Sequence, residues 1–255
     1  MGYCFGRQYE VCIIMDKIYV QSLEEYIKTV KNYYGNEGCP GIIKLFYRGH
    51  SKEDYGILPS LARCYNKELG EDATYIRHEK EIIERAKNEY PQIFRDTNSI
   101  DELALMQHYG IPTRLMDITD NPLVALFFAC KSNIGKHDGE VLLFAEGVYL
   151  EAFSSYDEKV IKDGNKIALI RTKTLSNRQR AQQGFYMWFP DNRLMGINKD
   201  DQILTGIITI PKDDKANMLN ELKMVGISTE KLFPDNIDMC CKEMVADIVK
   251  HDFSA

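Results

Sequence analysis

The chain has 255 residues, of which 44% are hydrophobic and 27% charged, and its net charge is −6 at neutral pH. This length and composition are typical of a globular protein with a substantial core, and they argue against a disordered or fibrous chain. The negative charge excludes a broad basic field for nonspecific nucleic-acid binding. No apolar run is long enough to cross a bilayer, so no membrane partner is expected.

Seven cysteines are spread along the sequence without CxxC spacing or a paired His/Cys pattern. Zinc sites need such spacing, so no metal site is predicted. The odd count favours reduced, mostly buried thiols. Because the first residues also lack the apolar run of a signal peptide, a cytoplasmic protein is expected.

The first 130 residues alternate predicted strands and helices. Residues 9–15 and 42–47 are rich in β-branched and aromatic side chains, which predicts two strands with Arg48 at the exit of the second. A helix is predicted over 22–34, where Ser22 and Glu25 form a capping box and Gly35 ends the helix. A second is predicted over 71–90, before Pro91. A third is predicted over 99–109, where Ser99 and Glu102 form a capping box and Gly110 ends the helix.

A polar connector, QHYGIPTRLMDITDNP, joins this last helix to an apolar run that begins with Asn121-Pro122. Asparagine as N-cap and proline at the first helical position predict a helix, and its all-round apolar character predicts burial. Polar side chains held between two buried helices either stabilise the fold or form a site.

Beyond residue 138 the pattern changes to strands, predicted over 139–146, 167–171, 185–189 and 203–210. A short polar helix over 176–183, closed by Gly184, interrupts them. These elements predict an α+β fold with a single domain over 1–255, in which a helical N-terminal half packs on a mostly antiparallel β-rich second half. The motif-bearing core spans about 42–131, the β-rich part 138–211 and the C-terminal helices 214–251.

Arg48 is the first candidate for ligand binding. A strand-end arginine followed by Gly49 presents a guanidinium fork beside backbone that a ligand can approach closely, and phosphate or carboxylate is its natural partner. The alternative is a structural arginine paired with Asp117. Arg63 and Arg114 are weaker candidates of the same kind, because Arg114 lies three residues before Asp117 and a local ion pair would satisfy both.

Two further positions carry polar groups that suit a site. His108, at a predicted helix end, could act as a general acid or base near neutral pH, or it could simply cap the helix. Gln183, before Gly184, could read an amide or a base edge, or it too could be a capping residue.

Several short motifs occur in a fixed order. They are Tyr47-Arg48-Gly49, Leu58-Pro59-Ser60 with Arg63, Gln107-His108-Tyr109-Gly110, Pro112-Thr113-Arg114-Leu115 with Asp117, and Pro122-Leu123. In these motifs the chain resembles the bacterial FRG domain family, which is named for its Phe/Tyr-Arg-Gly motif. The resemblance covers the middle third of the chain, and it implies a role in phage defence or a toxin system.

The segment Phe46 to Gly49 is also similar to the strand-borne Tyr-Arg-Gly motif of ADP-ribosyltransferases. By this analogy Arg48 holds the phosphates of NAD, Tyr47 or Tyr109 stacks on nicotinamide, and Glu140 is the first acid to test. ADP-ribosyl transfer from NAD or NAD hydrolysis is then the expected activity. The chain lacks an ExE or QxE pair near a late strand, which counts against catalysis.

Two other functions stay open. In the first, Arg48, Arg63 and Arg114 converge on a phosphorylated ligand, a nucleic-acid end or a phage component in a noncatalytic recognition module. In the second, the motif arginines and Asp117 form a buried network, and function lies in surface loops such as 151–165.

Overall fold

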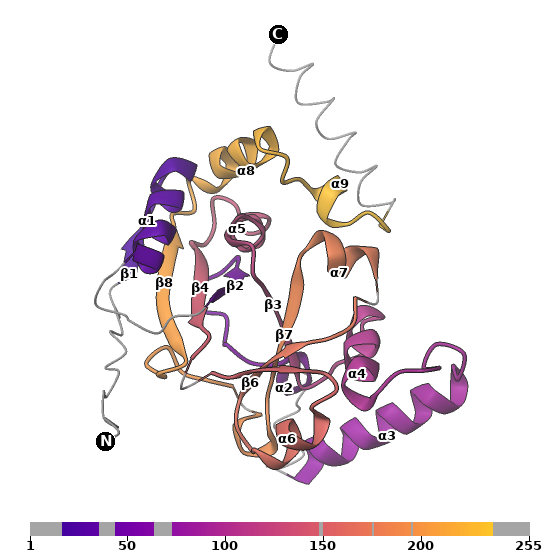
Figure 1. The fold of residues 1–255 in the computed structure, drawn as a ribbon. Coiled ribbons are helices and arrows are strands. Elements are labelled where there is room, and N and C mark those ends of the chain that lie inside the picture. Colours follow the sequence, from indigo (N-terminus) through magenta and orange to yellow (C-terminus); the bar gives the residue numbers. More distant parts are fainter. Residues whose placement is uncertain are drawn as a thin grey trace, which may run out of the picture.

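The computed structural model describes residues 17–35, 44–63, 73–147, 150–174, 176–194 and 196–236 (Figure 1). The predicted strand over 9–15 and the predicted last helix beyond residue 236 lie outside these ranges. An α+β arrangement is confirmed: helices surround one mixed sheet of eight strands in the order β1-β8-β4-β2-β3-β7-β6-β5. The strands are β1 (Lys17–Tyr19), β2 (Leu45–His50), β3 (Leu115–Thr119), β4 (Gly139–Ala145), β5 (Ala152–Ser154), β6 (Ala168–Arg171), β7 (Gly184–Trp188) and β8 (Leu204–Ile210).

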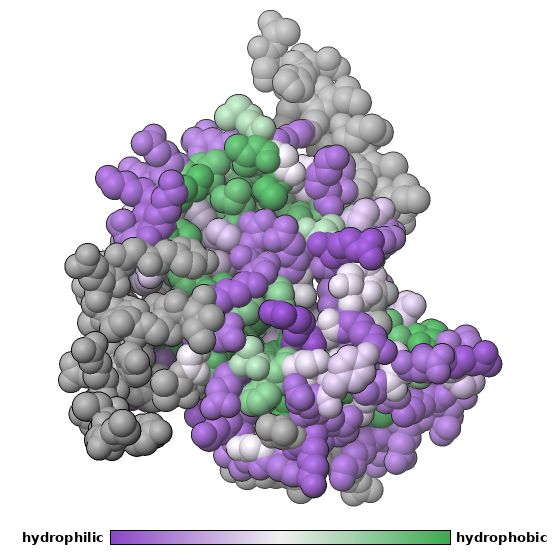
Figure 2. Space-filling model, in the orientation of Figure 1, coloured by the Kyte–Doolittle hydropathy of each residue, from purple (hydrophilic) through white to green (hydrophobic). Residues whose placement is uncertain are grey.

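The helices pack mainly around the outside of this sheet (Figure 1). They are α1 (Leu23–Gly35), α2 (Ser60–Arg63), α3 (Ala73–Glu89), α4 (Ser99–His108), α5 (Pro122–Cys130), α6 (Glu158–Asp163), α7 (Asn177–Ala181), α8 (Lys215–Met224) and α9 (Thr229–Leu232), with a 3-10 turn at Asp191–Arg193. Figure 2 shows a largely hydrophilic surface on this side, with apolar side chains gathered near α8.

The sheet consists of two four-stranded halves, β1-β8-β4-β2 and β3-β7-β6-β5. Strand β2 pairs with β4 over six positions, and β3 pairs with β7 over five. Across the middle, β2 and β3 pair only at Tyr47 and Thr119. We call this junction the seam, and beyond it the two halves of the sheet separate.

Alternation of side chains along the strands produces three cores. Residues from both half-sheets, among them Phe46, Met116 and Met187, point inward and pack together. Their strand neighbours point outward. In the first half, Tyr47 and its neighbours pack under α1, α5 and α8, while in the second half Tyr186 and its neighbours pack under α4.

Most predicted elements are present, but five details differ from the sequence analysis. Strand β3 lies inside the polar connector, which was not expected to contain a strand. Strand β2 continues through Arg48 to His50, because it pairs with β4 as far as Glu140. The N-cap of α4 is Asn98 rather than Ser99, since Asn98 accepts hydrogen bonds from the backbone of Ile100 and Asp101.

The fourth difference concerns the end of α7. Gln183 takes the left-handed backbone conformation there, with φ of 47°, and Gly184 is the first residue of β7. The segment 151–165, which was expected to be a surface loop, contains β5 and α6.

Candidate functional site

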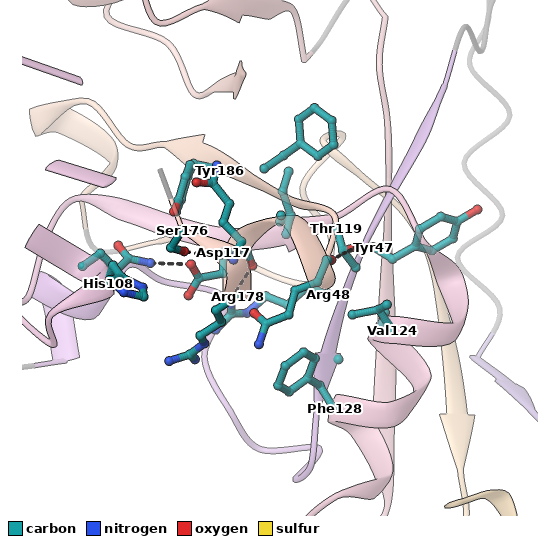
Figure 3. Close-up of a pocket in the computed structure, with 18 residues that line it drawn as sticks. Tyr47, Arg48, His108, Asp117, Thr119, Val124, Phe128, Ser176, Arg178 and Tyr186 are labelled. Atoms are coloured by element: carbon teal, nitrogen blue, oxygen red, sulfur yellow. Dashed lines mark hydrogen bonds between the residues drawn. The ribbon is translucent and has the colours of Figure 1, made fainter. Parts of the chain in front are cut away.

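A cavity of about 210 Å³ lies at the seam, between α5, α7 and the C-terminal end of α4 (Figure 3). It is lined by residues of both half-sheets: Tyr47, Arg48 and Gly49 of β2; Gln107 and His108 of α4; Asp117, Ile118 and Thr119 of β3; Val124, Ala125 and Phe128 of α5; and Ser176, Arg178, Gln179, Gln182, Gly184, Phe185 and Tyr186 from the region of α7 and β7. The cavity thus lies where β2 and β3 stop pairing, next to the single pair of Tyr47 and Thr119.

Arg48 bridges the seam. Its Nη1 donates a hydrogen bond to the backbone carbonyl of Asp117, and its Nε donates to Nε2 of His50 at 2.9 Å. The Asp117 carbonyl lies where β2 and β3 have already separated, so the side chain bonds a group that backbone pairing leaves available. The expected ion pair between Arg48 and the Asp117 carboxylate is replaced by this bond to the main chain.

Gly49 is required for helix packing. A Cβ at this position would lie 2.0 Å from the carbonyl oxygen of Ala125 and 2.6 Å from the backbone nitrogen of Ala129. Helix α5 therefore rests directly on β2, and the glycine borders the cavity as a consequence of that close packing.

A chain of hydrogen bonds joins the sequence motifs and ends at Asp117. The Ser60 hydroxyl accepts from the Thr113 backbone at 3.0 Å, and the Thr113 hydroxyl donates to Oε1 of Gln107 at 2.6 Å. The Gln107 amide then donates to Oδ1 of Asp117 at 2.7 Å. This chain fixes the Asp117 carboxylate at the cavity while leaving the residue exposed to solvent.

Tyr186 lies opposite Asp117 in the β3–β7 register. Burial, together with the negative charge of Asp117, raises the pKa of the Tyr186 phenol well above its ordinary value. The phenol is therefore protonated at neutral pH and remains a hydrogen-bond donor.

Helix α7 brings a second guanidinium to the cavity. Ser176 caps the helix by accepting from the Gln179 backbone at 3.0 Å, and Arg178 follows on the first turn. The Arg178 guanidinium lies over the Phe233 ring, 4.9 Å from its centre. Figure 3 shows Arg48, Asp117 and Arg178 grouped together, with Phe128 on one side and Tyr186 on the other.

The aromatic walls differ from those expected. Tyr47 contributes to the lining, but its side chain is fully buried in the core under α5. Tyr109 is 60% exposed and lies outside the cavity lining. Phe128, Phe185 and Tyr186 line the cavity instead.

The remaining predicted residues are placed as follows. His108 lines the cavity at the end of α4, with its ring edge-on to that of Tyr109. Gln183 is exposed and outside the lining, whereas its neighbour Gln182 lines it and donates to the Leu232 carbonyl at 3.1 Å. Arg63 ends α2, and its side chain lies outside the described part of the structure.

Arg114 lies away from the cavity, in a buried cluster of charges. It donates to both carboxylate oxygens of Glu79 and to Asp191, and its guanidinium stacks 4.8 Å above the Trp188 ring. Burial acts to lower the Arg114 pKa, but the hydrogen bonds and charges of Glu79 and Asp191 outweigh it and hold the pKa above its ordinary value. The expected ion pair of Arg114 with Asp117 is therefore wrong, because Arg114, directly before β3, pairs with Glu79 of α3 and with Asp191.

Glu140 also lies outside the cavity. Its carboxylate is fully buried and accepts from Lys199 at 2.7 and 2.9 Å, and it forms an ion pair with Lys17 at 3.2 Å. Two lysines thus neutralise the acid selected from the sequence. The carboxylate at the cavity is Asp117.

Comparison with known families identifies the central part of this architecture. Residues 43–138 match the family model of the FRG domain. The chain contains an FRG domain. No curated protein and no solved structure matches the chain.

The FRG domain builds one side of the cavity and the later part of the chain builds the other. Arg48, Gln107, His108, Asp117 and Phe128 lie within the matched segment, whereas Arg178 and Tyr186 lie beyond it. Sequence reasoning missed Asp117 and Arg178 as cavity residues. For Arg178 the sequence did hold a signal, namely a short polar helix directly before a strand. In that position the first turn of the helix lies near the end of the strand.

Two further observations come from the described residues. No helix there is both long and apolar enough to span a bilayer. In the same ranges, no group of three or more histidine, cysteine, aspartate or glutamate side chains is placed to hold a metal ion.

Proposed function

We propose that the cavity at the seam binds a nucleotide through its phosphates. The observation that carries this proposal is that two arginines and one carboxylate, from β2, α7 and β3, line one cavity with aromatic walls. Guanidinium forks match phosphate geometry, and the Asp117 carboxylate can accept hydrogen bonds from ribose hydroxyls. A ligand with both groups uses the whole arrangement, whereas inorganic phosphate uses only the arginines.

The size of the cavity restricts the ligand. Its volume of about 210 Å³ is below the range of roughly 300–1,000 Å³ that is usual for sites enclosing a drug-sized ligand. A mononucleotide or one end of a dinucleotide fits this space. A longer ligand such as NAD would extend out of the opening, with its second nucleotide on the surface.

NAD hydrolysis or ADP-ribosyl transfer is the catalytic form of this proposal. The bond between nicotinamide and ribose would break, with nicotinamide leaving with the bonding electrons, and water or an acceptor group would supply the new bond to the ribose carbon. Asp117 would stabilise the positive charge that develops on the ribose. Asp117 takes the role for which the sequence suggested Glu140, because Glu140 lies outside the cavity.

A noncatalytic recognition module is the second candidate. The sequestration of Glu140 by two lysines favours it, since that acid is then held away from any bound ligand. In this case the FRG domain would sense a nucleotide in a bacterial defence or toxin system without converting it.

Binding of ADP-ribose, measured by isothermal titration calorimetry, tests the proposal. Arg178→Ala should weaken binding by about tenfold or more, the usual cost of a lost charge-assisted hydrogen bond. Arg180→Ala is the matched control, because Arg180 lies on the same helix and is exposed but does not line the cavity. Equal affinity of both variants and wild type would contradict the proposal.

Asp117→Asn separates the two candidates. With NAD as substrate, an enzyme would release nicotinamide in the wild type and lose that activity in the variant, while both proteins keep their affinity for ADP-ribose within a few fold. Binding of ADP-ribose without nicotinamide release from NAD in the wild type would favour the recognition module.

A further inference from the structure

His50 lies next to the cavity without lining it, on the same strand as Arg48. The residue is buried, with 3% of its surface exposed. Its Nε2 lies 2.9 Å from Nε of Arg48. Arginine has N–H donors and no acceptor, so the imidazole nitrogen must be the acceptor in this bond. His50 is therefore neutral in this arrangement, with its proton on Nδ1.

This bond and the one to Asp117 hold the Arg48 guanidinium from two sides. Nε is fixed by His50 and Nη1 by the Asp117 carbonyl. Because the guanidinium is planar, two bonds on different nitrogens set the direction in which the fork faces the cavity. Loss of the His50 acceptor would leave only one of these two bonds.

We propose that His50 is a positioning residue for Arg48 and that its protonation weakens ligand binding at acidic pH. The proposal rests on the proposed function of the cavity. Protonated imidazole has a donor on both nitrogens. The Arg48–His50 contact then becomes donor against donor and positive against positive, so Arg48 must turn away and the cavity loses its oriented fork.

The charged groups around His50 act in both directions. Glu140 of β4 faces His50 in the strand register and favours the charged imidazole, whereas Arg48 of β2 opposes it. Lys17 of β1 and Lys199 before β8 bind Glu140 and reduce its effect.

Two more described groups lie near the imidazole. The Tyr55 ring packs edge-on against the imidazole, with 5.9 Å between ring centres. Lys215 of α8 donates to the carbonyl of the next residue, Ser51, at 2.8 Å and adds a further positive charge on that side. Glu53 and Asp138 are further carboxylates near these groups, since the charge of Glu53 acts on Lys17 and Lys215 and that of Asp138 acts on Lys215. The described contact that directly opposes a second proton on the imidazole is the N–H donor of Arg48.

The experiment compares ADP-ribose binding by calorimetry at about pH 8 and about pH 5.5, the interval in which histidines commonly titrate. The pyrophosphate of ADP-ribose is a diester and does not change charge in this interval, unlike a terminal phosphate, whose second pKa is near 6. We expect the wild type to lose about tenfold in affinity at the lower pH, as for one charge-assisted hydrogen bond.

Two substitutions of His50 separate positioning from mere packing. His50→Gln keeps an acceptor at the same reach but cannot be protonated in this range, so it should bind well at both pH values. His50→Leu fills similar space without an acceptor and should bind about tenfold more weakly at both. His137→Gln, which alters a histidine that does not line the cavity, should keep the wild-type ratio between the two pH values. Thermal melting of each variant checks that it is folded.

The outcomes are distinct. If His50→Gln shows the same loss at low pH as the wild type, or if His50→Leu binds as the wild type does at pH 8, the role of His50 is overturned while the proposed function stands. No ADP-ribose binding by the wild type at either pH overturns the proposed function. The positioning bond is then decided by nitrogen NMR of His50 at about pH 8, which should show the proton on Nδ1; a proton on Nε2 overturns it.

Discussion

Arg48 and Arg114 both belong to motifs of the FRG domain, but their surroundings differ in kind. Arg114 is held by two carboxylates and the face of Trp188 in a buried cluster. Among its described contacts, Arg48 donates to a backbone carbonyl and to an imidazole nitrogen, and it lines a cavity. Two arginines of one domain thus differ in their hydrogen-bond acceptors, and we propose that Arg114 stabilises the fold whereas Arg48 binds a ligand.

Removing Arg114 should have the largest effect on stability. Arg114→Met leaves the buried Glu79 carboxylate without its partner, which should cost roughly 3–5 kcal/mol in unfolding free energy and lower Tm by roughly 10 °C. Differential scanning calorimetry would measure this. The double variant Arg114→Met with Glu79→Leu should recover much of the loss, because neither buried charge remains. A normal Tm with lost ADP-ribose binding would instead make Arg114 a ligand residue.

Gly49→Ala should have the next largest effect, on the other side of the comparison. The added Cβ would overlap the Ala125 carbonyl, so α5 must move, at a cost of about 3 kcal/mol measured by urea unfolding. Because Phe128 moves with α5, ADP-ribose binding should also weaken. Gly184→Ala is the matched control, since its Cβ would meet Gln179 at an ordinary 3.5 Å. Equal stability of the two variants would refute close packing at Gly49.

Substitution of Glu140 tests whether the buried carboxylate acts on the cavity. Glu140→Gln removes the charge that Lys17 and Lys199 share and should destabilise the fold by about 2 kcal/mol. ADP-ribose affinity at pH 8 should stay within about twofold of wild type, well below the tenfold step of a lost charged contact. Loss of the neighbouring negative charge disfavours imidazolium at His50, so the fall in affinity should move to lower pH. If the affinity of the variant for ADP-ribose falls at the same pH as that of the wild type, Glu140 does not influence the protonation of His50.

The smallest expected effect is that of Phe233, which lies outside the FRG segment. Phe233→Leu keeps apolar volume but removes the ring under Arg178 and should weaken ADP-ribose binding by about two- to fivefold, as for one cation–π contact. In a double-mutant cycle the substitution should add little once Arg178 is alanine. An undiminished effect in that background would show that Phe233 acts independently of Arg178.

The sequence was informative where local signals decide the structure. Asn121-Pro122 and the left-handed Gly110 mark helix ends that the structure contains. The order of the motifs also indicated an FRG domain with its core at about 42–131, and the family model matches residues 43–138. Local capping chemistry and short motifs are properties of the chain itself, so they can be read before the fold is known.

The errors arose where distant pairing decides the structure. Arg48 was expected at the exit of a strand ending at Tyr47, although β4 pairs with β2 as far as His50 and α5 requires the missing Cβ of Gly49. Strand β3 was missed because it is a five-residue segment inside a connector between two helices, and it becomes a strand only when β7 pairs with it. Arg114 and Glu140 found partners 35 and 59 residues away, in Glu79 and Lys199, which sequence spacing could not indicate.

The seam has a mechanical consequence. Each half-sheet is joined by several backbone pairs, whereas the backbones of β2 and β3 pair at Tyr47 and Thr119. Side chains add the bond from Arg48 to Asp117 and the ion pair of Lys44 with Asp120. A ligand bound by Arg48 of one half-sheet and by Arg178 beside the other would connect the two halves. Amide hydrogen exchange in β2 and β3 would then slow together when the ligand is bound.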